Sequence, residues 1–444
     1  MSAPTFRSGV IEGFYGRPWT ERQRRRMLAD LGELGLNTYL YAPKDDLKHR
    51  ALWREPYAAD ELGALARLVE AANAAGVAFV YGLAPGLDLR FADEGDAAAL
   101  AGKVAQVLTL GARSVALLFD DVPRELREDD AARFGSLAAA QAHAANALHA
   151  QLRAAGGGEL LFCPTDYCAA MTRPSLPGSP YLHELGERLE PAIEVFWTGP
   201  EVISRTIEPD PMREVAAALR RRPLIWDNLH ANDYDLRRLH LGPYSGRPAA
   251  LKHEVSGILL NPNTEAGADF VPLMTLAAYL RDGPYRPRAA FLEAVAAWAD
   301  RLELAGGGAV AAEDLAFLAD FLYLPFEHGP AAQAFLEDVA YLLATPPAAW
   351  AETFGRATGA VRRLAGLART LTRLRDRDLL ADLRPYVVDV LAEAGRAAQS
   401  VAAKRARRGG EPPRDGIANV RRGGFAGELS SLLRAPCPGG GDAD

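Results

Sequence analysis

Eight short apolar segments alternate with helical patterns over roughly the first 280 residues of the chain. A short unbroken apolar run is typical of a strand that is covered on both faces, as the strands of parallel sheets are. Eight alternations of strand and helix therefore predict an α/β fold, the (β/α)8 TIM barrel. The predicted strands are Gly9–Glu12, Thr38–Tyr41, Ala78–Leu83, Val115–Phe119, Glu159–Phe162, Glu194–Trp197, Leu224–Trp226 and Gly257–Leu260.

Helical patterns fill most of the gaps between these segments, and several of them end at a glycine, as helices often do. An open, doubly wound sheet is the alternative arrangement of such elements. That fold usually carries a G-x-G-x-x-G turn after its first strand, and Glu12-Gly-Phe-Tyr-Gly16 does not have this form. The barrel is therefore the preferred prediction. The predicted helices are Thr20–Leu34, Asp60–Ala75, Asp96–Leu110, Ala131–Ala154 and Pro211–Arg221.

The pattern changes after Pro284-Tyr-Arg-Pro287, because residues 288–405 are rich in Ala and Leu with helical spacing. We expect a C-terminal all-α domain that packs against the barrel. A role in a homodimer or in the substrate groove is the alternative. The basic, Gly- and Pro-rich stretch from Lys404 past Arg421-Arg422 is predicted to be mobile. The predicted domains are a catalytic barrel at 1–284, a helical domain at 285–435 and a flexible tail at 436–444.

Composition excludes several classes of function. The net charge of -7 argues against binding to nucleic acid or to an anionic membrane. The chain has no run of 18 apolar residues, and its N-terminal MSAPTFRSGV lacks the apolar core of a signal peptide, so we expect a cytoplasmic protein. Cys163, Cys168 and Cys437 are expected to be reduced thiols. The histidines form no H-x-H or H-x-x-x-H pair, and we expect neither a metal nor a cofactor.

Polar residues follow nearly every predicted strand. The clearest case is the stretch Ser114–Val122, in which an apolar run leads directly into Asp120 and Asp121. In barrels of this type the C-terminal ends of the strands carry the chemistry. A structural alternative is that one Asp caps the next helix and the other is solvated. Donors, acceptors and aromatic rings at one rim indicate a pocket for a polyol. The other strand-end residues are Gly13, Lys44-Asp45-Asp46, Asp88, Asp166-Tyr167, Thr198, Asn228, Asp233, Asn261 and Asn263.

With these residues in place, the chain resembles glycoside hydrolase family 84, which comprises the O-GlcNAcases and bacterial β-N-acetylglucosaminidases. The resemblance extends from residue 9 to about 283 and is weaker across the helical part. Seven stretches match in the family's order, and together they are far more specific than any one of them. They are Gly9–Trp19, Tyr39–Asp46, Leu117–Asp121, Phe162–Cys168, Trp197–Pro200, Trp226–Asp235 and Asn261–Asn263.

The resemblance implies hydrolysis of terminal β-linked N-acetylglucosamine (GlcNAc) with retained anomeric configuration, through an oxazoline formed by the substrate's own 2-acetamido oxygen. It implies that Asp121 is the general acid and then the base. Asp120 would accept the acetamido N–H and stabilise the positive charge that develops on this group. Tyr167 would bind the acetamido oxygen, and Trp226 would wall the acetyl methyl. Ring hydroxyls would be bound by Gly13 (through its carbonyl), Lys44, Asn228, Asp233 and Asn261.

Taken singly, these residues also have structural explanations. Trp226 could be a core residue, Lys44 a solvated cation, and Gly13 part of a tight turn. The Asn and Asp residues of 228–235 could be turn residues, and Trp197 and Asp88 are predicted to be structural supports. The expected substrate is a GlcNAc-bearing protein or glycan, with O-GlcNAc on Ser or Thr preferred. The alternatives are a hexosaminidase of hyaluronan- or chitin-type fragments and a sugar-binding barrel without turnover.

Overall fold

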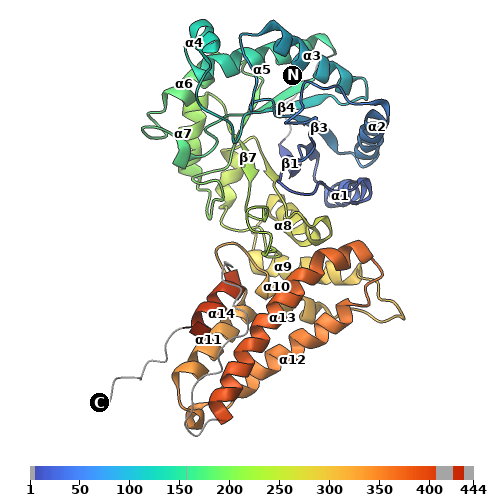
Figure 1. Cartoon of the computed structure of the whole chain (residues 1–444), viewed down its shortest axis with the longest axis vertical. Helices are drawn as coiled ribbons and strands as arrows, with labels where there is room; N and C mark the ends of the chain where they lie inside the picture. The colour runs from blue at the N-terminus through green and yellow to red at the C-terminus, as the bar shows by residue number, and fades with distance from the viewer. Residues whose placement is uncertain (1–5, 157, 407–423, 435–444) are drawn as a thin grey trace. The chain divides into compact units, whose positions relative to one another are not determined.

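The computed structural model describes residues 6–156, 158–406 and 424–434. Eight parallel strands form a closed barrel in sequence order, with β8 paired to β1 (Figure 1). This confirms the predicted (β/α)8 barrel, and every predicted strand is present. The strands are β1 (Arg7–Glu12), β2 (Thr38–Tyr41), β3 (Ala78–Leu83), β4 (Ser114–Leu118), β5 (Glu159–Cys163), β6 (Glu194–Trp197), β7 (Leu224–Asp227) and β8 (Gly257–Leu260).

Helices lie between the strands around the barrel (Figure 1). Local sequence sets their ends, as the first helix shows. The Thr20 side chain accepts a hydrogen bond from the backbone amide of Gln23, and the Gln23 side chain accepts one from the Thr20 amide, which makes a capping box. The helices of this region are α1 (Glu21–Leu34), α2 (Ala59–Ala74), α3 (Glu94–Leu108), α4 (Glu128–Phe134), α5 (Leu137–Ala154), α6 (Pro180–Arg188) and α7 (Pro209–Leu219).

The single helix predicted over Ala131–Ala154 is wrong, because α4 and α5 are separate helices. Gly135 adopts a left-handed backbone with φ 73°, which ends α4. Ser136 then caps α5 by accepting a hydrogen bond from the amide of Ala139. Helix α6 was not among the predicted helices, although Ser179 and Pro180 are typical first residues of a helix.

The interior of the barrel is filled with side chains. At the N-terminal ends of the strands, the Arg7 guanidinium donates to Glu194 Oε1 at 2.5 Å and to Glu159 Oε2 at 2.6 Å. These ion pairs connect the starts of β1, β5 and β6, so this end of the barrel has a structural role. The buried apolar cluster of the interior includes Ile11, Leu40, Val80, Ala116, Leu118, Leu161, Phe196 and Leu259.

The chain folds into two compact units. The first contains the barrel and comprises Met1–Asp233, Tyr244–Ala266 and Leu276–Tyr285. The second comprises Tyr234–Pro243, Gly267–Thr275 and Arg286–Asp444. The second unit thus includes two short segments that precede residue 285, and α8 (Phe270–Leu280) contributes to both units. The domain limits given above stay a prediction.

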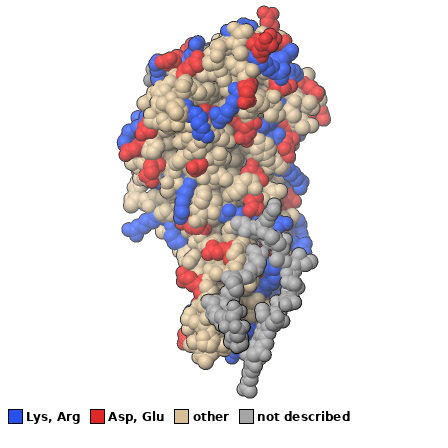
Figure 2. Space-filling model, turned by 60° about the vertical axis from the view of Figure 1, so that its left-hand side comes forward, with Lys and Arg blue, Asp and Glu red and all other residues tan. Residues whose placement is uncertain are grey.

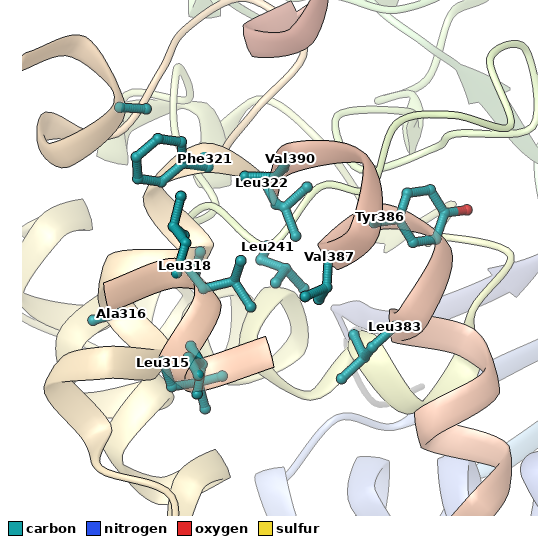
Figure 3. Packing of buried hydrophobic residues seen from close by; sticks show 14 of the residues in the cluster. Leu241, Leu315, Ala316, Leu318, Phe321, Leu322, Leu383, Tyr386, Val387 and Val390 are labelled. Carbon is teal, nitrogen blue, oxygen red and sulfur yellow. The ribbon is translucent and has the colours of Figure 1, made fainter. Parts of the chain in front are cut away.

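The second unit is helical, in agreement with the predicted all-α domain. Its described residues contain isolated bridges, such as the one between Leu304 and Leu374, but no strand. Leu241, Leu318 and Val387 belong to its apolar core (Figure 3). Its further helices are α9 (Pro287–Asp300), α10 (Ala312–Phe321), α11 (Pro330–Ala344), α12 (Thr353–Leu371), α13 (Arg377–Ala406) and α14 (Gly424–Arg434).

The mobility predicted from Lys404 onward is wrong at that residue itself. Lys404 lies in the last turn of α13, and its ammonium donates to the carbonyl oxygens of Leu342 and Leu343. Most of the basic stretch, including Arg421-Arg422, lies outside the described residues. The same holds for the predicted tail at 436–444.

The surface carries both signs of charge, and Figure 2 shows basic and acidic side chains interspersed over the face in view. An interspersed surface does not generate the extended positive field that attracts nucleic acid. The absence of a nucleic-acid partner stays a prediction. None of the helices described here is long and apolar enough to cross a lipid bilayer.

Gly9 of β1 tests how closely the strands of the barrel must approach. A Cβ atom at this position would lie 1.8 Å from the carbonyl oxygen of Thr38 on β2. No side-chain rotation can relieve a clash with the backbone of a paired strand. We predict that Gly9→Ala lowers the free energy of unfolding, measured by urea denaturation, by at least about 3 kcal/mol, the upper end of the usual cost of overpacking.

Gly102→Ala is the matched control, because a Cβ atom at this exposed position of α3 meets nothing within 4 Å. Alanine is favoured over glycine inside a helix, so this variant should be as stable as the wild type or slightly more stable. Equal losses in the two variants would contradict the packing argument for Gly9.

Candidate active site

The predicted site residues lie at the C-terminal ends of the strands, in the first unit. Because all eight strands are parallel, these ends meet at one rim of the barrel. Gly13 follows β1, Lys44 follows β2, Asp120 and Asp121 follow β4, and Tyr167 follows β5. Trp226 lies on β7, which Asn228 and Asp233 follow, and Asn261 follows β8.

A buried ion pair joins Lys44 and Asp120, which are 6% and 7% exposed. The Lys44 ammonium donates a hydrogen bond to Asp120 Oδ2. Burial by itself raises the pKa of Asp120, but the positive charges of Lys44 and Arg50 outweigh burial and bring the pKa below its ordinary value. Asp120 is therefore a charged carboxylate at neutral pH.

The other oxygen of the Asp120 carboxylate, Oδ1, is buried and has no hydrogen-bond partner among the described residues. An unsatisfied buried acceptor is costly, and native structures contain few of them. An oxygen in this state is suited to accept an N–H or O–H group from a ligand.

Asp121 has the opposite environment, because it is exposed and its carboxylate accepts two tyrosine hydroxyls. Tyr167 donates to Oδ1 at 2.7 Å, and Tyr15 donates to Oδ2 at 2.9 Å. Burial, and then the negative charge of Asp121, raise the pKa of both tyrosines, which therefore keep their protons. Neither aspartate caps the following helix α4, which has Arg127 at its N-cap, so the helix-capping alternative is wrong.

The backbone of Asp121 is strained. Its φ of 52° lies in the left-handed region, which residues other than glycine seldom adopt. Such a conformation costs about 1–3 kcal/mol and persists only where the surrounding structure imposes it. Strain of this kind is concentrated at functional sites.

Trp226, on β7, packs closely against Gly13, which follows β1. The indole is 5% exposed, packs edge-on against Phe196 with ring centroids 5.4 Å apart, and has the Lys44 ammonium 5.7 Å from its ring centroid. A Cβ atom on Gly13 would come within 2.5 Å of the Trp226 ring. Gly13 is therefore needed to make room for the indole, whatever its carbonyl contacts.

Two amide side chains lie together at the ends of β7 and β8. Asn261 Nδ2 donates to Asn228 Oδ1 at 2.9 Å, and Asn228 Nδ2 donates to the carbonyl of Val202 at 2.7 Å. Asn261 Oδ1 is buried and lacks a hydrogen-bond partner within the described part of the chain. Asp233 accepts a hydrogen bond from the backbone amide of Tyr15 at 2.9 Å.

Sequence reasoning did not single out Tyr15, Arg50 or Glu12. Tyr15 lies within a stretch that matched the family, but nothing in the local sequence indicates Arg50, which donates to the Tyr15 hydroxyl at 2.8 Å. Glu12 is fully buried, and its carboxylate accepts hydrogen bonds from Arg24 Nε at 2.8 Å and from Arg24 Nη2 at 2.7 Å. This pair supports the loop after β1.

Trp197 and Asp88 were predicted to be structural supports. Trp197 is fully buried, and Asp88 accepts hydrogen bonds from Trp53 Nε1 at 2.8 Å and from Arg54 Nη1 at 2.6 Å. The described residues contain no group of three or more His, Cys, Asp or Glu side chains arranged to hold a metal ion.

Comparisons with known proteins point to one family. A family model described as beta-N-acetylglucosaminidase matches residues 8–319. The protein O-GlcNAcases of Rattus norvegicus and Mus musculus are each 46% identical over 280 residues, which is 63% of this chain but 30% of the relative. An O-GlcNAc hydrolase mutant of Thermobaculum terrenum has a solved structure that matches with a TM-score of 0.79 at 30% identity, covering 90% of this chain and 84% of that one.

The ion pair with Lys44 should control the titration of Asp120. In the wild type the lowered pKa stabilises the folded state above the ordinary value of 3.8, and this stabilisation is lost as the pH falls through the lowered value. In Lys44→Met the positive charge of Arg50 remains, but burial, the largest single influence on Asp120, is no longer opposed by Lys44. The pKa of Asp120 should therefore rise, and stability should fall as the pH rises. We predict a stability deficit relative to the wild type that widens between about pH 4 and pH 7, towards the 3–5 kcal/mol typical of a broken buried pair.

Urea denaturation at each pH measures this deficit. Lys48→Met is the control, because Lys48 pairs with Glu61, whose side chain is 40% exposed, and solvent screens such a pair. A Lys44→Met deficit of the same size at every pH would show that lost packing, and not the charge on Asp120, causes it.

Proposed function

The chain belongs to the beta-N-acetylglucosaminidase family, and on this premise we propose that it hydrolyses terminal β-linked GlcNAc with retention of anomeric configuration. The matched region contains all nine candidate site residues. The earlier resemblance to family 84 is confirmed at the level of family. The aligned region is 30% of the length of the two curated relatives, so the activity of this chain is a proposal in its own right.

One observation carries the proposal: a buried, charged Asp120, whose Oδ1 has no hydrogen-bond partner among the described residues, is followed directly by an exposed Asp121. Retaining glycosidases that use a protein nucleophile place two carboxyl groups about 5–5.5 Å apart, flanking the scissile bond. Adjacent residues at the end of one strand suit two tasks on one side of the sugar. This arrangement favours a reaction in which the substrate supplies the nucleophile.

In the first step the acetamido oxygen attacks the anomeric carbon, and the bond to the leaving-group oxygen breaks. Asp120 Oδ1 accepts the acetamido N–H and offsets the positive charge that develops as the oxazoline closes. Asp121 gives its proton to the departing oxygen. In the second step Asp121 removes a proton from water, which opens the oxazoline and regenerates the free acetamido group.

Tyr167 must change partners during this cycle. Its hydroxyl carries one proton, which it now donates to Asp121 Oδ1. If it instead donates to the acetamido oxygen of a bound substrate, Asp121 Oδ1 becomes free to face the leaving group. Trp226 would then cover the acetyl methyl.

The remaining candidates have groups that suit sugar hydroxyls. Lys44 has three N–H donors, so it can maintain its hydrogen bond to Asp120 and also donate one to a sugar hydroxyl. Asn261 Oδ1 is an unpartnered acceptor within the described residues. We assign Asn228, Asp233 and the Gly13 carbonyl to further hydroxyls.

We favour GlcNAc attached to Ser or Thr of proteins as the substrate. The rat and mouse relatives are named protein O-GlcNAcases. The loops after β2, β3 and β6 also present exposed apolar side chains, Leu47, Leu87 and Val202. Apolar side chains on the rim suit a polypeptide next to the sugar, whereas a glycan offers mainly hydroxyls. Hyaluronan- or chitin-type fragments are the alternative substrates.

The cytoplasmic location and the homodimer stay predictions. Cys163 and Cys168 are both free and buried, which suits a reducing compartment.

The two aspartates should respond differently to the leaving group. A general acid contributes about 10²–10⁴ in rate, but only where the leaving group needs a proton. We predict that Asp121→Ala loses about this much kcat/KM with a poor leaving group, while 2,4-dinitrophenyl GlcNAc is largely spared in the first step. Asp120→Ala should impair every substrate, because the acetamido group is common to all of them.

The measurement is kcat/KM for each variant over aryl leaving groups of graded acidity. A steep dependence for Asp120→Ala and a shallow one for Asp121→Ala would mean that the two roles are exchanged. Equal dependences would mean that neither residue is the acid.

The acetamido group should be required for turnover. We predict hydrolysis of 4-nitrophenyl β-GlcNAc and strong inhibition by a thiazoline analogue of the oxazoline, because intermediate mimics bind far more tightly than substrates. The matching 4-nitrophenyl β-glucoside should not be hydrolysed. Comparable rates on the glucoside would exclude the mechanism.

The substrate is tested by comparing chitobiose with an O-GlcNAc-modified protein. Release of GlcNAc from chitobiose but not from the modified protein would exclude the protein substrate.

A further inference from the structure

Arg50 lies in the loop after β2 and is only 7% exposed. Buried arginines usually pair with carboxylates. Among the described residues, the Arg50 guanidinium bonds instead to two neutral oxygens: Nη1 donates to the Tyr15 hydroxyl at 2.8 Å, and Nη2 donates to the backbone carbonyl of Asp121 at 3.2 Å. Arg50 thus contacts the acid residue both directly and through Tyr15.

The hydrogen bonds that run from Arg50 through Tyr15 to Asp121 have a fixed direction. Arginine can only donate, so the Tyr15 hydroxyl accepts from Arg50 and its proton is left for Asp121 Oδ2, which lies 2.9 Å away. The guanidinium also lies 5.3 Å from the centroid of the Tyr15 ring, which favours this placement of the ring. A hydroxyl without Arg50 would be free to rotate its proton away from Asp121.

The second hydrogen bond acts on the backbone. Asp121 has a φ of 52°, a conformation that its surroundings must hold. The bond from Arg50 Nη2 to the Asp121 carbonyl is one such constraint. The two bonds together fix both the backbone and one carboxyl oxygen of Asp121.

We propose that Arg50, acting through Tyr15, is a positioning residue that anchors Asp121 Oδ2 and leaves Oδ1 as the oxygen that exchanges the proton with the leaving group. Tyr167 occupies Oδ1 at rest and leaves it when it turns to the substrate. The acid then holds its proton on Oδ1, while Oδ2 still accepts from Tyr15. The proton passes from Oδ1 to the departing oxygen, and the carboxylate that remains is held by the same two residues. This inference rests on the proposed role of Asp121 as the acid.

The test compares Arg50→Met and Tyr15→Phe with the wild type over aryl GlcNAc substrates of graded leaving-group acidity. We expect kcat/KM to fall about 10- to 100-fold with the poorest leaving group and to change little with 2,4-dinitrophenyl, because a misplaced acid loses no more than the lower end of the 10²–10⁴ that a general acid contributes. The double variant should be no worse than the worse single variant, because both changes break one chain of contacts. Arg50→Lys should recover only part of the loss, since an ammonium lacks the planar fork of donors.

Arg67→Gln is the matched control, because Arg67 is exposed on α2 and pairs with Glu21. Its dependence on the leaving group should equal that of the wild type. Losses in Arg50→Met that are the same for every leaving group would overturn the proposal, since a general structural defect has that effect.

A crystal structure of Arg50→Met decides the question without any assay. We expect Asp121 to leave its left-handed backbone conformation, or its Oδ2 to lose the Tyr15 hydroxyl. An unchanged Asp121 would overturn the positioning role. If the wild type released no dinitrophenol, the proposed function would fail instead, and the crystal structure would still decide the role of Arg50.

Discussion

Two opposite charges, on Lys44 and Asp120, lie buried side by side where β2 and β4 end. Taking two ions out of water costs several kcal/mol for each, and their attraction does not always recover this cost. Apolar residues at the two positions would often be at least as stable. The pair is better explained by the charge it maintains than by stability, because it keeps a carboxylate ionised in a buried position. The other contacts of the site adjoin it: the indole of Trp226 lies beside Lys44, and Asp121 follows Asp120.

The two ends of the barrel use charge in different ways. At the N-terminal ends of the strands, Arg7 pairs with two glutamates that are themselves partly open to solvent, so water can also solvate their charges. At the C-terminal ends, Asp120 Oδ1 has no hydrogen-bond partner within the described part of the chain, and the backbone of Asp121 is strained. The first end holds the strands together, and the second tolerates local cost where a ligand can relieve it.

The strands could be predicted because a barrel strand is covered on both faces and is therefore apolar along its length. Val115–Phe119 was predicted for β4, and the observed strand is shifted by one residue. The separation of α4 and α5 was missed, although Gly135 followed by Ser136 is a stop and a start signal for helices. The apolar spacing resumes after the break, and this continuity concealed it.

Other features depend on tertiary structure and could not be predicted locally. Tyr15, Arg50 and Asp121 lie on the loops after three different strands, and they meet only when the barrel closes. The matching stretch Tyr39–Asp46 ends before Arg50, so the family resemblance did not reveal it either. Leu241 belongs to the core of the second unit although it lies within the barrel's part of the chain, and no periodicity indicates such an exchange.

The close contact between Gly13 and Trp226 has a consequence for how this pocket could evolve. The ring already lies where a side chain at position 13 would begin, so the backbone just after the first strand and the indole are in direct contact. Gly13 has no side chain, so no substitution at position 13 can widen the space beside the ring. If Trp226 covers the acetyl methyl, a chain of this kind can acquire tolerance for a bulkier N-acyl group only through changes on the indole side. A larger residue at position 13 would first require a smaller ring at position 226, so the two positions should change together or not at all.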